Sequence, residues 1–134
     1  QSKDETDRVL SQLKITVRTN YSNPPTHGAS IVASVLQSPE LRALWEKELG
    51  EMRTRIKSMR RGLVDGLKAA GVKQDMSFIT TQVGMFSYSG LSKEQMLRLR
   101  SEFGVYGTDT GRMCVAALNT RNLAHVAQAI AAVL

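Results

Sequence analysis

Arg112 is the residue of this sequence with the clearest capacity to bind a ligand. It follows a polar turn, Gly107-Thr-Asp-Thr-Gly111, and begins an apolar run that ends at Leu118. Apolar runs bounded by Gly, Thr and Asp are typical of strand, turn and strand. An arginine fixed at its base by a strand can hold a carboxylate bidentately through its planar guanidinium. The alternative interpretation is an ordinary surface arginine at a strand end.

Other chemistry is hard to recognise in the sequence. No nucleophile–base pair or paired carboxylates can be identified, and the glycines have the wrong spacing for dinucleotide binding. His27 and His125 are isolated, and no His or Cys cluster has metal-ligand spacing. The single cysteine, Cys114, excludes an internal disulfide. Its apolar setting favours a small core residue in a reducing compartment, and therefore a cytoplasmic protein.

The composition is that of a globular protein with 134 residues, 42% hydrophobic residues and a net charge of +6. No apolar run is long enough to span a bilayer, so we expect no membrane partner. The positive charge is concentrated in one segment, at Arg53, Arg55, Lys57, Arg60 and Arg61. These residues alternate with the apolar positions of a predicted helix and lack interleaved aromatic residues. We therefore expect a solvated helix face and no nucleic-acid partner.

Two helices are predicted in the first part of the chain. Ser2-Lys-Asp-Glu5 has the spacing of a capping box and starts an amphipathic helix that reaches Arg18. The segment 20–28 contains two adjacent prolines and interrupts the helical pattern. Residues 29–37 have the spacing of a short buried helix, with a strand as the weaker alternative.

A long helix is predicted from Pro39 to Ala70. Ser38-Pro39-Glu40 is a strong helix start, and apolar residues then recur at steps of three and four. Such a helix is about 48 Å long, whereas a compact chain of this size has a diameter of roughly 36 Å. We therefore expect the helix to reach another domain or another chain.

After Gly71 the pattern changes to short elements. Strands are predicted at 76–81, 84–90, 105–106 and 113–118. A helix is predicted from Ser92 to Phe103, ended by Gly104, and a last helix is capped by Asn119 or Thr120. This order predicts an α+β fold: a small sheet with helices packed mainly on one face, plus the long domain-crossing helix.

Three segments in order give the chain a specific resemblance. They are Arg18-Thr-Asn-Tyr-Ser-Asn-Pro-Pro-Thr-His-Gly28, Gly84-Met-Phe-Ser-Tyr-Ser-Gly-Leu91, and Glu102-Phe-Gly-Val-Tyr106 leading to Gly111-Arg112. Together they resemble the C-terminal third of aspartate and aromatic aminotransferases, which are fold-type I enzymes that use pyridoxal 5'-phosphate. The resemblance extends over the whole chain.

The resemblance implies a domain organisation and two binding residues. Residues 1–49 would be the end of the large cofactor-binding domain, and 50–134 the C-terminal small domain, in a homodimer with active sites between subunits. Arg112 matches the arginine that binds the substrate α-carboxylate. Arg18 matches the arginine that reaches the neighbouring subunit's site and binds a side-chain carboxylate. The substrates would be an amino acid and a 2-oxo acid.

The resemblance also implies what this chain lacks. The lysine and phosphate-binding residues that hold the cofactor lie upstream in the family, so we expect no catalytic residue and no bound cofactor here, and an inactive fragment. The first residue, Gln1, agrees with a processed or edited chain or a fragment. Asp109 departs from the small or apolar residues usual before Gly-Arg and could compete for Arg112, while Met113-Cys114 looks more like the bacterial aromatic branch. The alternative hypothesis is a free-standing binding or regulatory domain without catalysis.

Overall fold

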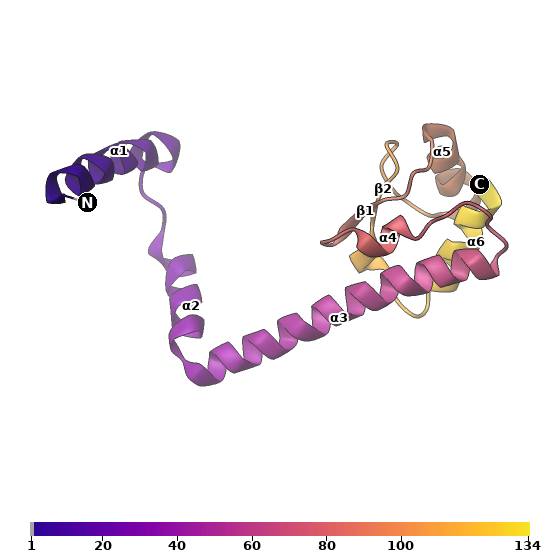
Figure 1. Cartoon of the computed structure of the whole chain (residues 1–134), viewed down its shortest axis with the longest axis horizontal. Coiled ribbons are helices and arrows are strands. Elements are labelled where there is room, and N and C mark those ends of the chain that lie inside the picture. Colours follow the sequence, from indigo (N-terminus) through magenta and orange to yellow (C-terminus); the bar gives the residue numbers. More distant parts are fainter. Residues whose placement is uncertain (1) are drawn as a thin grey trace. The chain divides into compact units, whose positions relative to one another are not determined.

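A computed structural model describes residues 2–134, which divide into two compact units (Figure 1). The first unit extends to Glu46, and the second comprises Lys47–Leu134. The boundary falls inside the long helix α3, Pro39–Ala69. This helix confirms the prediction of a helix from Pro39 to Ala70. Ser38 starts it as expected, because its Oγ accepts the backbone N–H of Leu41 at 3.3 Å.

The first unit contains α1, Lys3–Tyr21, and α2, Thr26–Gln37. The predicted capping box is confirmed: Ser2 Oγ accepts the N–H of Glu5 at 3.2 Å, and the Glu5 carboxylate accepts the N–H of Ser2 at 3.1 Å. Helix α1 continues beyond Arg18, and α2 begins earlier than the predicted residue 29. Neither helix contains a buried residue, although both carry several apolar side chains.

The second unit is organised around a two-stranded antiparallel sheet. β1, Phe86–Tyr88, pairs with β2, Arg112–Cys114, so that Tyr88 lies opposite Arg112. Ser87 is 2% exposed, whereas Phe86 and Tyr88 on either side of it are exposed. Helices therefore cover one face of the sheet only, which confirms the predicted α+β class.

Three of the predicted strands are corrected. Residues 76–81 contain the short helix α4, Phe78–Thr81, because Asp75 Oδ1 accepts the N–H of Ser77 at 2.9 Å and begins a helical turn. The hydroxyl of Ser77 also donates to this carboxylate, and the two hydrogen bonds lower the pKa of Asp75. The pair 105–106 forms no strand. The run 113–118 leaves the sheet after Cys114 as the 3₁₀ helix η1, Val115–Ala117.

The last two helices differ in how well the sequence predicts them. In α5, Lys93–Phe103, the Ser92–Gln95 capping box and the left-handed Gly104, with φ +65°, are both confirmed. Helix α6, Leu123–Val133, begins later than predicted. Asn119 Oδ1 accepts the N–H groups of Arg121 and Asn122 and closes a turn before the helix instead of capping it.

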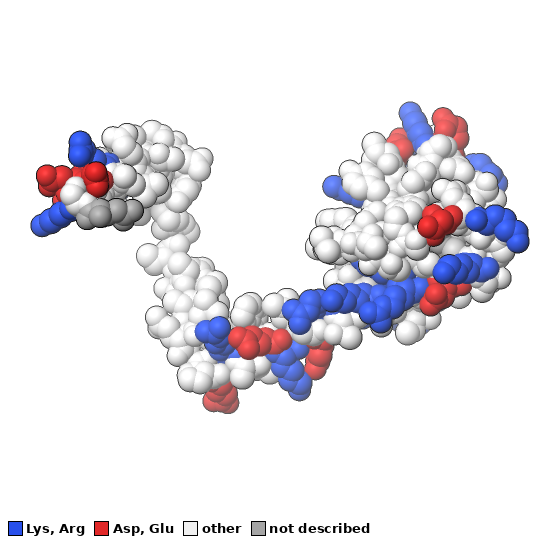
Figure 2. All heavy atoms as spheres, in the orientation of Figure 1, with Lys and Arg blue, Asp and Glu red and all other residues white. Residues whose placement is uncertain are grey.

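On the face drawn in Figure 2, Lys and Arg side chains are prominent along α3. Arg53, Lys57 and Arg61 are exposed, as the interpretation of a solvated face requires. Within residues 2–134, no helix combines the length and apolar character needed to cross a membrane.

Helices α3 and α6 approach closely at glycine positions of α3. A Cβ added to Gly66 would lie 2.8 Å from the Cβ of Ala127, and one added to Gly62 would lie 2.7 Å from Leu123 Cδ2. A Leu side chain can rotate away, but a methyl group attached to a helix backbone cannot. Gly66, which weakens the helix by propensity alone, is therefore required by packing.

We predict opposite effects for two glycine substitutions in α3. Gly66→Ala should lower the free energy of unfolding by about 1–3 kcal/mol, because overpacking against Ala127 outweighs the gain in helix propensity. Gly50→Ala is the matched control. No atom lies within 4 Å of its added Cβ, so it should raise stability by about 0.5–1 kcal/mol. Urea unfolding of both variants measures the difference, and stabilisation by Gly66→Ala would contradict the packing argument.

Candidate functional site

Arg112 lies at the start of β2, as the sequence predicts, and its backbone is fixed on both sides. Its N–H donates to Thr108 Oγ1 at 3.1 Å, and its carbonyl accepts the N–H of Thr108 at 2.9 Å. The preceding Gly111 has φ +83°, and a Cβ there would lie 2.9 Å from the carbonyl oxygen of Leu91. Only glycine fits this position. The conformation of the turn therefore fixes where the backbone of Arg112 begins the strand.

The Arg112 guanidinium lies over the ring of Phe86 on the neighbouring strand, with Cζ 4.8 Å from the ring centroid. This cation–π contact places the positive charge against the ring and involves no hydrogen bond from the guanidinium N–H groups. Within residues 2–134, the Arg112 side chain makes no hydrogen bond or ion pair. The arrangement is an exposed, oriented guanidinium that can accept a carboxylate.

Asp109 forms no ion pair with Arg112. Its Oδ1 lies 2.9 Å from Nη2 of Arg100 on α5, and the same nitrogen donates to the carbonyl of Gly107 at 3.3 Å. The acidic residue that could compete for Arg112 therefore has another partner. The side chains are 40% and 47% exposed for Arg100 and Asp109, respectively, so the ion pair is a surface contact.

Arg18 belongs to the first unit and lies in the last turn of α1. Its Nη1 donates to Ser22 Oγ at 2.5 Å, so the tip of this exposed side chain has a partner within its own unit. Ser22 has φ +63° and ends the helix. Arg18 and Arg112 thus lie in separate units.

The expectation of a solvated basic face is wrong for one arginine of α3, Arg60. Arg60 is only 2% exposed and donates four hydrogen bonds, to Ile79, Gly84, Phe86 and Ser87. Burial lowers the pKa of its guanidinium.

Arg55 also has backbone partners, since it donates to the carbonyls of Ala116 and Leu118, both at 2.8 Å. The spacing of Arg55 and Arg60 among apolar residues gives no sign of this. No other sequence signal indicates it, because the carbonyls that accept from Arg55 and Arg60 all lie in segments that the sequence predicts as strands.

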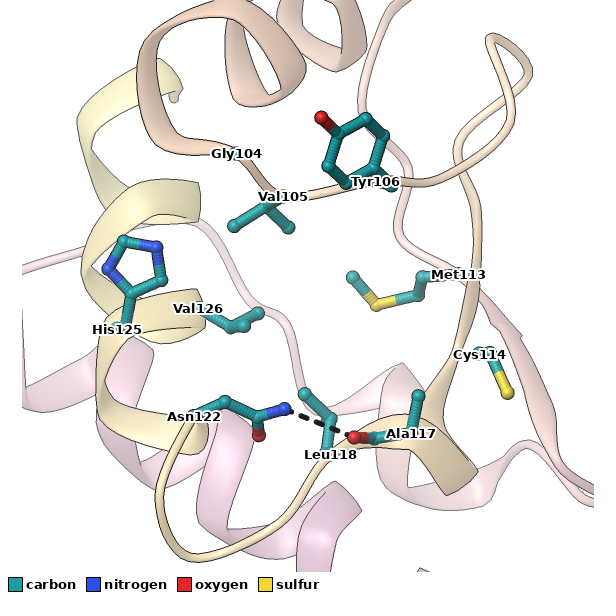
Figure 3. Close-up of a pocket in the computed structure, with 10 residues that line it drawn as sticks. All are labelled: Gly104, Val105, Tyr106, Met113, Cys114, Ala117, Leu118, Asn122, His125 and Val126. Carbon is teal, nitrogen blue, oxygen red and sulfur yellow. Dashed lines mark hydrogen bonds between the residues drawn. The ribbon is translucent and has the colours of Figure 1, made fainter.

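A pocket of about 240 Å³ is lined by residues that follow α5, by residues of β2 and η1, and by residues at the start of α6 (Figure 3). His125 and Cys114 lie on opposite sides of it, so they form no thiol–imidazole pair (Figure 3). His125 Nε2 lies 2.9 Å from the carbonyl oxygen of Phe103, which can only accept, so this nitrogen carries the proton. Asn122 Nδ2 donates to the carbonyl of Ala117 at 3.1 Å. Arg112 is not among the lining residues.

In the part of the chain that the structure describes, no group of three or more His, Cys, Asp or Glu side chains gathers as metal ligands would. The lysines are all exposed on this chain. Arg112, its ring partner Phe86 and the groups that fix them are therefore the candidate site.

The chain belongs to the family described as aminotransferase class I and II, whose profile matches residues 4–130. It is 63% identical over 134 residues to an aspartate aminotransferase of Pseudomonas aeruginosa, covering 100% of this chain and 34% of that protein. It is 54% identical over 127 residues to an aromatic-amino-acid aminotransferase of Escherichia coli, covering 95% of this chain and 32% of that protein.

A solved structure shows the same fold. It is an aromatic-amino-acid aminotransferase from Burkholderia pseudomallei covalently bound to pyridoxal phosphate, with 70% identity and a TM-score of 0.94. The match covers 100% of this chain and 34% of that one. The chain thus spans about a third of the length of these relatives.

Double-mutant cycles should identify the partner of Asp109. We expect a coupling free energy of about 0.5 kcal/mol between Arg100→Gln and Asp109→Asn, which is the range for exposed ion pairs. The matched cycle of Arg112→Gln with Asp109→Asn should give no measurable coupling, because Asp109 already has its partner. Urea unfolding at low salt measures both cycles. A larger coupling to Arg112 than to Arg100 would mean that Asp109 occupies the candidate site.

Proposed function

We propose that this chain is the C-terminal part of a pyridoxal-phosphate-dependent aspartate or aromatic aminotransferase, in which Arg112 binds the substrate α-carboxylate. The whole enzyme would transfer an amino group between an amino acid and a 2-oxo acid. The observation that carries the proposal is the free, oriented guanidinium of Arg112 over Phe86, with Asp109 held by Arg100. The C-terminal placement is supported by the order of the three matching segments along the chain.

Arg112 contributes orientation and charge. Two parallel hydrogen bonds to a carboxylate fix both the position and the rotation of a substrate. The Phe86 ring restricts the guanidinium on one face, so less side-chain freedom is lost when the carboxylate binds. Because every amino acid substrate carries an α-carboxylate, this contact is common to all of them.

The cofactor is assigned to the part of the enzyme outside this chain. When bound, pyridoxal phosphate supplies the electron sink for the reaction. The resemblance matches no residue here to its lysine or to its phosphate-binding groups, and the exposed lysines of this chain offer no enclosed attachment point. The residues present therefore do not form the cofactor site, and we propose that the chain alone is inactive.

The domain assignment is also a proposal: residues 1–49 as the end of the large domain, and 50–134 as the small domain. It is supported by the absence of any buried residue in α1 and α2, whose apolar side chains remain exposed. Leu13 is 56% exposed and Val32 58%. Such helices need a further body of protein to cover them. A homodimer with Arg18 acting across the subunit interface fits this requirement.

The single cysteine bears on the compartment. Because Cys114 is a free thiol, it favours a cytoplasmic enzyme.

The alternative function is a free-standing binding or regulatory domain. The exposed apolar side chains of α1 and α2 count against it, because a domain that stands alone buries such residues. The coding sequence upstream of Gln1 distinguishes the two functions: a long domain with a cofactor lysine supports the enzyme, and a nearby start codon supports the alternative.

In the full-length enzyme, Arg112→Ala should lower kcat/KM by about 100-fold or more for every amino acid substrate. Losing a charge-assisted bidentate contact costs about 3 kcal/mol when its partner is otherwise left unpaired. The cofactor absorbance should be unchanged. Arg121→Ala, which removes an exposed arginine of the same unit, is the control and should have near-normal kinetics. Near-normal kinetics for Arg112→Ala would mean that this residue is an ordinary surface arginine.

Arg18→Leu in the full-length enzyme should separate the substrate classes. If Arg18 binds the side-chain carboxylate in the partner's site, kcat/KM for aspartate should fall by about 100-fold or more, because the buried carboxylate loses its counter-charge. Phenylalanine should lose much less, since its ring requires no charge. Arg8→Leu, on the exposed surface of the same helix, is the control. Equal losses for aspartate and phenylalanine would give Arg18 a purely structural role.

A further inference from the structure

The four hydrogen bonds of Arg60 all go to the segment that contains β1. Its Nη1 donates to the carbonyl of Ile79 at 2.9 Å and to Ser87 Oγ at 3.0 Å. Its Nη2 donates to the carbonyls of Gly84 and Phe86, both at 2.8 Å. One planar group thus connects helix α3 to α4, to the turn before β1, and to β1 itself.

The charge of Arg60 is stabilised without a carboxylate. No ion pair involves this residue among those that the structure describes, although its side chain is 2% exposed. An apolar residue would fill the same space without the cost of burying a charge. A guanidinium is useful here because its rigid fork fixes several carbonyl oxygens at defined positions simultaneously.

Two routes lead from Arg60 to Arg112. In the first, Arg60 holds the carbonyl of Phe86, whose ring lies under the Arg112 guanidinium. In the second, Arg60 donates to Ser87 Oγ, and this hydroxyl donates in turn to Oε1 of Gln82.

Gln82 continues the second route to the strand residue opposite Arg112. Its Oε1 accepts the N–H of Tyr88 at 2.9 Å, and its Nε2 donates to the Tyr88 carbonyl at 3.1 Å. Tyr88 is the register partner of Arg112 in the sheet. The stacked ring and the paired backbone of Arg112 are therefore both fixed by groups that bond to Arg60 or to its acceptor.

We propose that Arg60 is a positioning residue for the carboxylate site: its buried guanidinium fixes β1 and thereby orients Arg112 for its ligand. The inference rests on the proposed function of Arg112. Arg60 touches no ligand itself and acts through Phe86, Ser87 and Gln82. Lysine cannot replace it, because a single ammonium group cannot reach four acceptors in a plane.

The test uses the full-length enzyme with its cofactor and two related probes, 3-phenylpropanoate and 3-phenylpropanamide. The ratio of their dissociation constants, measured by calorimetry, reports binding of the carboxylate itself. Arg60→Lys should weaken binding of the acid by about tenfold through misplacement of Arg112, and should leave binding of the amide unchanged. In the Arg112→Ala background, Arg60→Lys should have no further effect on the acid.

Arg55→Lys is the matched control. Arg55 lies on the same helix and also donates to backbone carbonyls, but its acceptors are Ala116 and Leu118 and not β1. It should leave the ratio of the two dissociation constants unchanged. If Arg60→Lys does not fold, Ser87→Ala provides the same test, because it removes one acceptor and the link to Gln82. It should weaken binding of the acid by a smaller factor.

The outcomes separate this inference from the proposed function. Loss of acid binding in Arg60→Lys that disappears in the Arg112→Ala background supports positioning. Wild-type acid binding in Arg60→Lys or Ser87→Ala, with loss in Arg112→Ala, overturns the inference and leaves Arg112 in place. Additive losses in the double variant also overturn it. Unchanged acid binding in Arg112→Ala overturns the proposed function, and this inference with it.

Discussion

A buried guanidinium, that of Arg60, holds together the part of the second unit that carries the candidate site. Strand β1 has only three residues, and the carbonyls at positions 79, 84 and 86 lie in it or shortly before it. One arginine from α3 satisfies all three and also bonds to the Ser87 hydroxyl. A two-stranded sheet has little stability by itself, so the placement of β1 depends on this side chain.

The close approach of α3 and α6 provides the base for that arrangement. Gly66 lets Ala127 lie against the α3 backbone, and the surrounding core is filled by aliphatic residues such as Leu63, Leu67 and Ile130, none more than 1% exposed. The first unit contrasts with this, since α1 and α2 bury no residue. The second unit has a core of its own, whereas the apolar side chains of α1 and α2 remain exposed.

The sequence predicts the elements whose signals are local. The capping boxes at Ser2 and Ser92, the proline start at Pro39 and the left-handed Gly104 each depend on hydrogen bonds within a few residues, and each is found where expected. The candidate site is predicted in part, because Arg112 does begin a strand after a turn. Its roles, and those of Arg18, stay predictions.

The failures have two physical causes. Residues 76–81 begin a helical turn at the Asp75–Ser77 hydrogen bond, although their composition is that of a strand. Residues 115–117 also have the composition of a strand, but Arg55, which is distant in the sequence, donates to the carbonyls of Ala116 and Leu118. The spacing of Arg60 likewise does not distinguish it from the other basic residues of α3, because its hydrogen-bond partners are distant in the sequence.

The sequence by itself determined the five longer helices, the turn before Arg112, the α+β class and the family resemblance, because these follow from local patterns. Only the tertiary structure decided which arginines are buried, that Arg100 rather than Arg112 holds Asp109, and that Phe86 lies under the guanidinium. Those outcomes depend on which distant carbonyls, rings and charges meet in space, and no local pattern encodes that.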